Sequence, residues 1–475
     1  MSRFESIEAQ VLEGAPVPAL EHLHLADALR ATARRNPTRG IGCQDLAGSR
    51  RRSYPGQLAA AAVFAGRLRE AGVRARQPVL LGELPNHALI DAFWGCQLAD
   101  AVPVVLPPGA GQPAGRHSVA VDGAEPVVLA HPGRPPFELA GLGRAAVVCF
   151  TAGRRRPIAL SHEQILARAR GTSAHNGWDA SERTYNFLPL RHVSGLLMFH
   201  VRDLLAGAEQ RHDLPGPVLA EPLTLLARLA ETRATLAWLT PPLLRALADR
   251  LAVAGAPGPV PDLRTLMLGG DRVVAADLHR VERHAGLGPG VIVAGYGLTE
   301  AGSGIVSATG PAPEAGIVPV GRPEPGSTVR VVPEPGRSLG AVQVTGVACG
   351  SPHAWFDTGD VGLVADGALT VLGSRADVLL GPDRAWHAAE LEELLADLGW
   401  PRPGEVVAVP DPAGVRLHLH PANLAAPAAA RAAALVEERT GLRVAGLCPL
   451  PAGGVPRAGH GKPLRSQLAG TGEAG

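Results

Sequence analysis

Short apolar runs alternate with longer stretches rich in alanine and leucine from residue 20 to about residue 370. Pro78–Leu81 is one such run, and it precedes residues 88–99, which we expect to form a helix. Ala145–Phe150 is another, and it is followed by a loop and by residues 161–164 (SHEQ), which we expect to form a capping box at a helix start. Strands that alternate with helices form layered α/β folds. The alternation therefore predicts an α/β protein with strands at these two runs.

The sequence pattern changes beyond about residue 376. Residues 388–398 predict a helix with four leucines on one face, and residues 405–409 and 415–420 predict short strands. The leucines are Leu391, Leu394, Leu395 and Leu398. We therefore expect a large N-terminal domain of layered sheets and helices over residues 1–376 and a small α+β C-terminal domain over residues 377–475.

Composition limits the partners and the location of the protein. The 45 basic and 44 acidic residues give a net charge of +1, so no overall field favours nucleic acid or an anionic membrane. The five cysteines are widely spaced without a C-x-x-C pair, which argues against a disulfide framework and a zinc site. The start of the sequence has no signal-peptide core, and no apolar run approaches the ~20 residues of a membrane span. We expect a cytoplasmic protein with no membrane span and no nucleic-acid partner.

Four short segments are informative through their order and spacing. They are residues 295–300 (GYGLTE), 355–360 (WFDTGD), 373–377 (GSRAD) and 455–462 (VPRAGHGK). They resemble the Y-G-x-T-E, W-F-x-T-G-D, G-R-x-D and P-R-T-x-x-G-K motifs of the adenylate-forming superfamily of acyl-CoA synthetases, peptide-synthetase adenylation domains and luciferases. Within that superfamily, residues 187–210 are most similar to acyl-AMP ligases that load carrier proteins of polyketide and hybrid peptide assembly lines. Each motif alone also fits an ordinary loop, and the ordered set carries the resemblance.

The resemblance implies a set of catalytic residues. Joining a carboxylate to ATP brings two anions together, so cations must converge on the site. By resemblance, Lys462 bridges the substrate carboxylate and the α-phosphate, Glu300 holds Mg²⁺, and Thr299 contacts a phosphate oxygen. His192 would lie near the acyl group, and a packed or capping histidine is the alternative at that position.

The resemblance also implies residues that bind the nucleotide. Asp360 would accept hydrogen bonds from the two ribose hydroxyls, with Arg375 nearby. The other residues implied to line the nucleotide and acyl pocket are Tyr296, Gly297, Gly269, Gly270 and Asp271.

The phosphate loop departs from the family pattern T-S-G-[ST]-T-G-x-P-K-G-V. Residues 151–157 read TAGRRRP, which is shorter and lacks the hydroxyl and glycine cluster that forms a backbone cradle. Arg156 stands where the loop lysine would be. A site built from Thr151, Gly153, Arg154, Arg155 and Arg156 is therefore expected to hold the triphosphate by charge, and a solvated surface turn is the alternative. If this loop does not hold ATP, two alternatives are open: a non-catalytic acyl or adenylate binder, or an enzyme that runs only the second half of the reaction from a supplied acyl-AMP.

The reaction implied by the resemblance has two steps and uses ATP and Mg²⁺. A carboxylic acid and ATP give acyl-AMP and pyrophosphate, and a phosphopantetheine thiol then gives a thioester and AMP. We expect the thiol to belong to an acyl or peptidyl carrier protein supplied in trans. Coenzyme A is the alternative acceptor, which would make the protein an acyl- or aryl-CoA ligase. Asp377 is the expected hinge about which the C-terminal domain turns between the two steps.

Lys462 is the only lysine among the 45 basic residues. A compositional accident is one explanation, because the chain uses arginine wherever it carries any other positive side chain. The other explanation is chemical. An ammonium group is a compact charge that enters a crowded site where a planar guanidinium does not fit.

Overall fold

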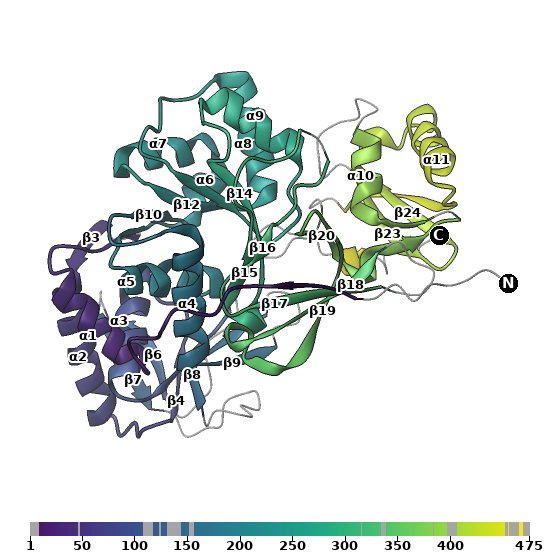
Figure 1. Cartoon of the computed structure of the whole chain (residues 1–475). Helices are drawn as coiled ribbons and strands as arrows, with labels where there is room; N and C mark the ends of the chain where they lie inside the picture. The colour runs from purple at the N-terminus through teal and green to yellow at the C-terminus, as the bar shows by residue number, and fades with distance from the viewer. Residues whose placement is uncertain are drawn as a thin grey trace. The chain divides into compact units, whose positions relative to one another are not determined.

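Two compact units make up the chain. The larger consists of Glu13–Thr328 and Thr345–Trp355, and the smaller of Met1–Leu12, Val329–Val344 and Phe356–Gly475. This computed structural model (Figure 1) describes residues 9–45, 48–107, 117–122, 125–130, 144–151, 156–314, 316–333, 339–382, 384–396, 406–451, 455 and 465–468. No helix in these described ranges combines the length and apolar character needed to cross a membrane.

The large unit contains two extensive sheets. The first has nine strands in the order β16 (Arg322–Pro323), β15 (Ser303–Ser307), β14 (Ile292–Leu298), β13 (Thr265–Leu268), β12 (Leu236–Leu239), β10 (Arg183–Asn186), β11 (Glu209–His212), β2 (Gly40–Asp45) and β3 (Gly48–Ser53). The second has six strands in the order β7 (Glu125–Ala130), β6 (His117–Asp122), β4 (Pro78–Leu81), β5 (Val102–Val105), β8 (Ala145–Phe150) and β9 (Pro157–Ser161). These sheets and their helices confirm the predicted α/β fold.

Helices of the large unit pack against both sheets. They are α1 (Leu25–Arg35), α2 (Tyr54–Glu70), α3 (Asn86–Leu98), α4 (His162–Asn176), α5 (Arg202–Ala206), α6 (Pro215–Ala220), α7 (Leu223–Thr232), α8 (Pro241–Ala254) and α9 (Ala275–Ala285). Apolar side chains of α1, α2 and α3 form one buried core with those of β2 and β4. The core therefore joins strands of both sheets through three helices.

The expected strands at Pro78–Leu81 and Ala145–Phe150 are confirmed as β4 and β8. Helix α3 begins at Asn86, two residues before the predicted start. The reason is a cap from a distant strand, because the Asp45 carboxylate accepts a hydrogen bond from the Asn86 amide at 2.9 Å. No local pattern in the sequence reveals that cap.

Most of a five-stranded sheet and a separate core belong to the small unit. The sheet order is β1 (Gln10–Glu13), β17 (Thr328–Pro333), β18 (Gly340–Gly346), β19 (Ser351–Ala365) and β20 (Ala368–Ser374). The remaining elements are β21 (Val378–Leu380), β22 (Ala385–His387), α10 (Ala388–Ala396), β23 (Val406–Asp411), β24 (Gly414–Leu419), α11 (Ala426–Thr440) and β25 (Val444–Pro449). Leu391 and Leu395 of α10 are fully buried in the core formed by these remaining elements. The predicted boundary at residue 376 falls inside this unit and remains a prediction.

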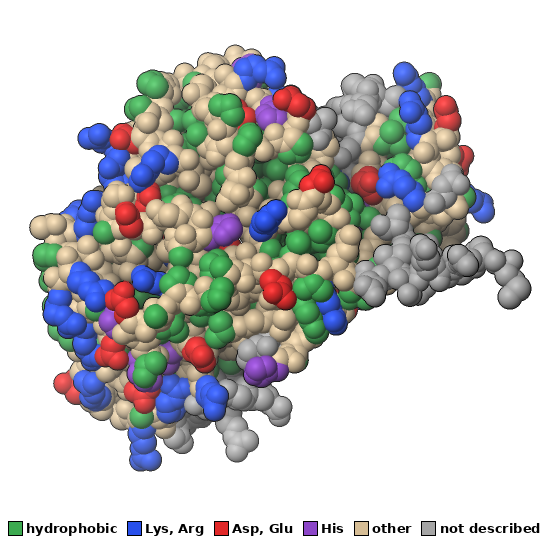
Figure 2. All heavy atoms as spheres, in the orientation of Figure 1, with side chains coloured by type: hydrophobic (Ala, Val, Ile, Leu, Met, Phe, Trp, Pro, Cys, Tyr) green, Lys and Arg blue, Asp and Glu red, His purple; other side chains and the backbone are tan. Residues whose placement is uncertain are grey.

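Charge is mixed on the face of the protein that Figure 2 draws. Figure 2 shows basic side chains interspersed with acidic ones over the face drawn. This distribution agrees with the net charge of +1.

Candidate active site

Several predicted residues follow parallel strands of the nine-stranded sheet. β10, β12, β13 and β14 are parallel neighbours, so their carboxyl ends share one edge. β11 lies on the other side of β10. The chain therefore continues from β10 to β11 in one direction across the sheet and from β12 to β13 in the opposite direction. Ligands of such sheets bind at this edge, beside the point where the directions change. His192 follows β10 in the sequence, Gly269 follows β13, and Glu300 follows β14.

A tight hairpin presents Tyr296, Thr299 and Glu300. β14 pairs antiparallel with β15, and the register shifts between Tyr296 and Gly297. A Cβ atom at Gly297 would overlap the backbone oxygen of Ser303, so only glycine fits there. Thr299 and Glu300 form the short 3₁₀ turn that follows β14. The compact turn places the Glu300 carboxylate directly after the end of the strand.

The stem of the shortened phosphate loop lies against this hairpin. The Arg156 amide donates a hydrogen bond to the Thr151 hydroxyl at 3.0 Å, and the Thr151 amide donates to the Arg156 carbonyl at 3.0 Å. These two bonds close the stem at the ends of β8 and β9. The Arg156 guanidinium then donates to Glu300 Oε1, forming an ion pair that is partly open to solvent. The structure thus brings together Thr151, Arg156 and Glu300, three of the predicted site residues.

A side chain of helix α4 holds the turn that contains Glu300. Its N-cap Ser161 accepts a hydrogen bond from the Gln164 amide at 3.1 Å, which confirms one half of the predicted capping box. The reciprocal bond, from the Ser161 amide to the Gln164 side-chain oxygen, is not among the hydrogen bonds of the described residues, and the Gln164 side-chain amide donates to the Glu300 carbonyl at 2.8 Å. Gln164 therefore fixes the main chain of the residue whose carboxylate meets Arg156.

His192 lies on a second segment that is tied to the same hairpin. Its Nδ1 accepts a hydrogen bond from the Ser194 amide at 3.3 Å, so the proton of the neutral ring lies on Nε2. The Ser303 hydroxyl, at the start of β15, donates to the Ser194 hydroxyl at 3.2 Å. The contact links the segment around His192 to the turn that carries Glu300.

A π-helix over Ser194–Val201 continues this segment and is anchored by buried polar groups that sequence reasoning missed. Within it, His200 Nε2 accepts a hydrogen bond from the Trp94 indole at 2.7 Å, so the imidazole proton lies on Nδ1 and is donated to Gln210 Oε1 at 2.9 Å. His212 Nε2 donates to the same oxygen at 2.9 Å. Burial lowers the pKa of His200 to about 4 and that of His212 well below its usual range. Both rings are therefore neutral and fixed in one tautomer.

Gly269, Gly270 and Asp271 follow β13 at the same edge of the sheet. A Cβ atom at Gly269 would overlap the ring of Trp238, a residue of the neighbouring strand β12. The Asp271 carboxylate accepts a hydrogen bond from the Arg272 amide at 2.9 Å. Because Gly269 has no side chain, the Trp238 indole ring packs directly against the loop that follows β13.

The predicted ribose-binding residues lie in the small unit. Asp360 on β19 pairs in register with Ser374 on β20, which places it beside the following residue, Arg375. The Arg375 guanidinium donates to both carboxylate oxygens of Asp357, at 2.8 and 3.0 Å. Asp357 was not predicted, although it belongs to the WFDTGD segment. Asp377 ends the 3₁₀ turn that begins at Arg375.

Four predicted residues lie outside the described residues. They are Gly153, Arg154, Arg155 and Lys462. Their assigned roles remain predictions.

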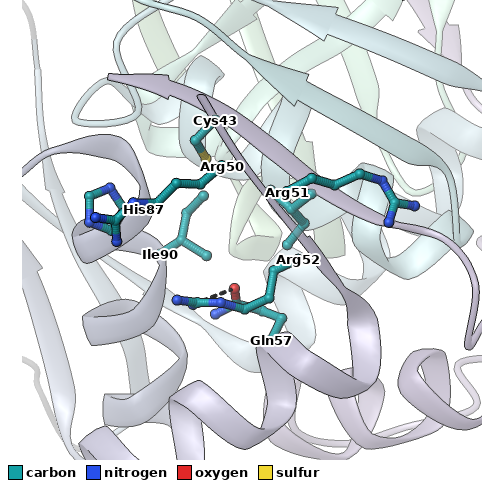
Figure 3. A pocket seen from close by; sticks show the side chains of 8 residues that line it. Cys43, Arg50, Arg51, Arg52, Gln57, His87 and Ile90 are labelled. Atoms are coloured by element: carbon teal, nitrogen blue, oxygen red, sulfur yellow. Dashed lines mark hydrogen bonds between the residues drawn. The ribbon is translucent and has the colours of Figure 1, made fainter. Parts of the chain in front are cut away.

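A cavity of about 290 Å³ lies at the other end of the nine-stranded sheet, beside β3 (Figure 3). It is lined by Ile41, Cys43, Arg50, Arg51, Arg52, Gln57, His87 and Ile90. Arg50 and Arg52 extend to one side of β3 and Arg51 to the other (Figure 3). Arg51 forms an ion pair with Glu209, and Arg52 with Asp91. None of the predicted site residues lines this cavity, and carboxylates already neutralise two of its three arginines.

Part of the chain matches a known protein family and its relatives. The sequence model described as "AMP-binding enzyme" matches residues 138–351. An atromentin synthetase of Suillus grevillei is 28% identical over 289 residues, which are 53% of this chain but only 30% of that relative's length. A feruloyl-CoA synthase of an Amycolatopsis species is 28% identical over 402 residues, which are 74% of this chain and 79% of the relative.

A solved structure confirms the fold over nearly the whole chain. The structure of McyG A-PCP complexed with phenylalanyl-adenylate matches with a TM-score of 0.78 and 21% identity, and the match covers 97% of this chain and 84% of that chain. The matched region, residues 138–351, contains the Thr151–Arg156 stem, the carboxyl edge of β10 to β14, and the Glu300 turn. Residues 138–351 of this chain are therefore similar to the AMP-binding enzyme family.

Proposed function

We propose that this protein activates a carboxylic acid with ATP as an acyl-adenylate and transfers the acyl group to a phosphopantetheine thiol of a carrier protein. The observation that carries the proposal is the meeting of Arg156 and Glu300 at the carboxyl edge of the sheet. A cation from the phosphate loop and a carboxylate from the YGLTE segment converge there although the loop is shortened. Such a pair suits a triphosphate and its metal ion, because the Arg156 cation has the charge opposite to that of the phosphates and the Glu300 carboxylate has the charge opposite to that of the metal ion.

The residues that the structure describes fit ATP and Mg²⁺, which the family uses. Mg²⁺ is commonly held by one or two carboxylates together with substrate phosphates and water. Among the described residues, no cluster of three or more His, Cys, Asp or Glu side chains forms a metal cage. Glu300 would therefore hold the ion jointly with the nucleotide, and the ion would supply neutralisation of phosphate charge. Arg156 would exchange its carboxylate partner for a phosphate oxygen when the nucleotide binds.

The first step needs a positive charge at the reacting atoms. Attack of the substrate carboxylate on the α-phosphate forms an acyl–phosphate bond and breaks the bond to pyrophosphate, with negative charge developing on the phosphoryl oxygens. We assign the stabilisation of this charge to Lys462 and contacts with the phosphate oxygens to Thr299. Asp360 would accept the ribose hydroxyls, and Tyr296 would lie against the adenine.

The second step needs a thiol at the same carbonyl carbon. The thiol attacks the acyl carbon, loses its proton, and displaces AMP to leave a thioester. The small domain beyond residue 376 would turn about Asp377 between the steps so that Lys462 leaves and the thiol enters. His192 would lie beside the acyl group at the carboxyl end of β10.

The acceptor defines a second candidate function, an acyl- or aryl-CoA ligase. The observation that favours it is the match to feruloyl-CoA synthase, which spans 74% of this chain and 79% of that relative. A thiol on coenzyme A and one on a carrier protein react alike, so only the acceptor differs. The shortened loop motivates a third candidate, a protein that binds acyl groups or adenylates without catalysis.

One experiment separates the three functions. Pyrophosphate release is measured with ATP across a panel of aliphatic, aromatic and amino acids, and thioester formation is then followed with coenzyme A and with a phosphopantetheinylated carrier protein. The proposal expects pyrophosphate release with some acids and acyl transfer to the carrier. Transfer to coenzyme A alone would establish the ligase, and binding of acyl-adenylate without pyrophosphate release for any acid would establish the non-catalytic binder.

A further inference from the structure

Gln210 lies at the centre of a buried hydrogen-bond network in the large unit. Its side-chain oxygen accepts hydrogen bonds from the rings of His200 and His212, each at 2.9 Å. Its side-chain nitrogen donates to the Tyr54 hydroxyl at 2.9 Å and to the His200 carbonyl at 3.2 Å. Gln210 is 2% exposed, and its three partners are fully buried. The side-chain amide therefore uses both of its hydrogens and both acceptor positions of its oxygen, which fixes its orientation.

One branch of the network ends on the main chain after β10. Because His212 Nε2 donates to Gln210, His212 Nδ1 is an acceptor, and the Asn186 side chain donates to it at 3.1 Å. The same Asn186 nitrogen donates to the Leu188 carbonyl at 3.0 Å, and the Leu188 amide donates to Asn186 Oδ1 at 3.0 Å. This branch therefore connects Gln210 to the main chain of Leu188.

The other branch ends on the π-helix, to which His200 belongs. Such helices are rare, and they occur frequently at functional sites. At the start of this one, the Leu196 amide donates a hydrogen bond to the His192 carbonyl at 3.0 Å. A Cβ atom at Gly195 would overlap the carbonyl oxygen of Pro189. The first turn of the π-helix therefore lies directly against the segment that contains His192.

Residues 187–193 are thus held at both ends by groups that share Gln210. A role in stability alone does not require such a network, because apolar groups of the same shape can replace buried hydrogen-bonding partners at little cost. A network in which every hydrogen bond is satisfied instead specifies one arrangement of its members. Loss of the Gln210 amide would leave the N–H groups of His200 and His212 without their acceptor, and the two attachments would no longer be coupled.

We infer that Gln210 is a positioning residue for acid binding, which holds residues 187–193 so that His192 stays beside the acyl group. This inference rests on the proposed function. Gln210 acts through the two histidines and not on the acid itself. Its contribution is to restrict the segment to one position before the carboxylic acid binds.

The residues assigned to ATP are positioned by different contacts. Arg156 is held by the stem of the phosphate loop, and the main chain of Glu300 by the side chain of Gln164. Loss of the Gln210 network should therefore weaken the binding of the carboxylic acid and leave the binding of ATP unchanged. A general loss of stability would affect both substrates alike.

Three variants separate positioning from stability. Gln210→Met keeps the length of the side chain and removes all four hydrogen bonds. Asn186→Leu breaks the network at its far end. Gln97→Met is the matched control, because Gln97 is also buried and donates a hydrogen bond, to the Ala146 carbonyl at 2.8 Å, without being part of the network.

The test measures pyrophosphate release against the concentrations of the acid and of ATP, together with amide hydrogen exchange, in the intact chain. In Gln210→Met, the half-saturating concentration of the acid should rise by at least about tenfold, because a displacement of ~1 Å can cost ~10²-fold. That of ATP should stay within about twofold of the wild type. Amides of residues 187–193 should exchange faster. Asn186→Leu should change in the same direction, and Gln97→Met should change neither property.

Two outcomes would overturn the inference. One is a Gln210→Met protein with an unchanged requirement for the acid and unchanged exchange at residues 187–193, and the other is an equal rise in the requirements for the acid and for ATP. If the wild type releases no pyrophosphate with any acid, the proposed function fails, and the exchange comparison still decides whether Gln210 fixes the segment. Should Gln210→Met not fold, Tyr54→Phe removes one partner of the amide and enters the same comparison, with a smaller rise for the acid alone expected.

Discussion

The guanidinium of Arg156 donates a hydrogen bond to the carboxylate of Glu300 across 144 residues of sequence. The arginine ends the stem of the shortened phosphate loop, and the glutamate lies in the middle of the turn after β14. The pair shows that a loop without the family's hydroxyl and glycine cluster still brings a cation to the YGLTE segment. Triphosphate binding by this loop remains a prediction, in which Arg156 exchanges its carboxylate partner for a phosphate oxygen.

The first prediction concerns this pair. Arg156→Ala should raise the ATP concentration needed for half-maximal pyrophosphate release by about ten- to hundredfold, because hydrogen bonds to charged groups contribute ~1.5–3 kcal/mol. Thioester formation from supplied acyl-adenylate should not change. Arg250→Ala removes a surface ion pair with Glu221 in the same unit and serves as the control. Equal ATP dependence in the wild type and Arg156→Ala would contradict the role.

The second prediction is a loss of stability in mild acid from the buried histidines. The unfolded chain takes up protons on His200 and His212 below about pH 6.5, whereas the folded His200 stays neutral down to about pH 4. Because the unfolded state binds more protons in this window, the free energy of unfolding falls as the pH falls. Each histidine should contribute a loss of roughly 1 kcal/mol between pH 7 and pH 5.5.

Urea unfolding at pH 7 and pH 5.5 checks this. His200→Gln should unfold at lower urea at both pH values and show a smaller difference between them. The exposed residue His420, at the end of β24, provides a control in His420→Gln. A pH dependence that His200→Gln leaves unchanged would show that other groups cause it.

The third prediction concerns a buried ion pair that connects α4 to the segment after β16. Arg168 and Glu324 are 3% and 0% exposed and form a direct ion pair. Ser327 accepts a hydrogen bond from Arg168 at 3.1 Å, and Ser307 donates to Glu324 at 2.7 Å. Glu324→Gln leaves a buried guanidinium without its counter-charge and should lower the free energy of unfolding by ~3–5 kcal/mol.

A double-mutant cycle tests the coupling of this pair. Arg168→Met combined with Glu324→Gln should cost clearly less than the sum of the two single changes, because neither charge is left alone. Unfolding in urea at pH 7 gives the four free energies. Additive effects would mean that the two side chains do not stabilise each other.

The fourth prediction tests the close packing at Gly269. Gly269→Ala introduces a methyl group where the Trp238 ring lies, and overpacking of this kind costs ~1–3 kcal/mol. Gly258→Ala meets nothing within 4 Å and is the matched control. The combination of Gly269→Ala with Trp238→Leu should recover part of the loss because the smaller side chain leaves room. A Gly269→Ala protein as stable as the control would contradict the packing.

Local patterns predicted those parts of the fold that depend on local chemistry. The apolar runs at β4 and β8 were readable because buried strands are built from continuous apolar residues, and the Ser161 cap was readable because a hydroxyl satisfies the free amides of a helix start. The early start of α3 was not readable, since its cap is Asp45, a residue of another strand. The partner of Gln164 was missed for the same reason.

The candidate site also contains some residues that local sequence identifies and some contacts that only the folded chain determines. Motif order identified Glu300 and Arg375, and the comparison of the phosphate loop identified Arg156. The pairing of Arg156 with Glu300 and of Asp357 with Arg375 was not predicted, because it depends on chain segments that only the fold brings together. The π-helix over Ser194–Val201 was not predicted, because a nearly continuous apolar run carries no signal that separates it from a buried α-helix. Its anchoring histidine, His200, has no recognisable spacing to Trp94 or Gln210.

The measurement that tests the central claim most directly is pyrophosphate release by Lys462→Arg. If Lys462 stabilises the charge that develops during acyl-adenylate formation, Lys462→Ala should slow release by at least ~10²-fold. Lys462→Arg should fail as well, because a guanidinium is wider than an ammonium and differently hydrated. Acyl-adenylate supplied from outside should restore thioester formation in both variants. Full pyrophosphate release by Lys462→Arg would instead show that the single lysine is a compositional accident and would contradict its assigned role in forming the adenylate.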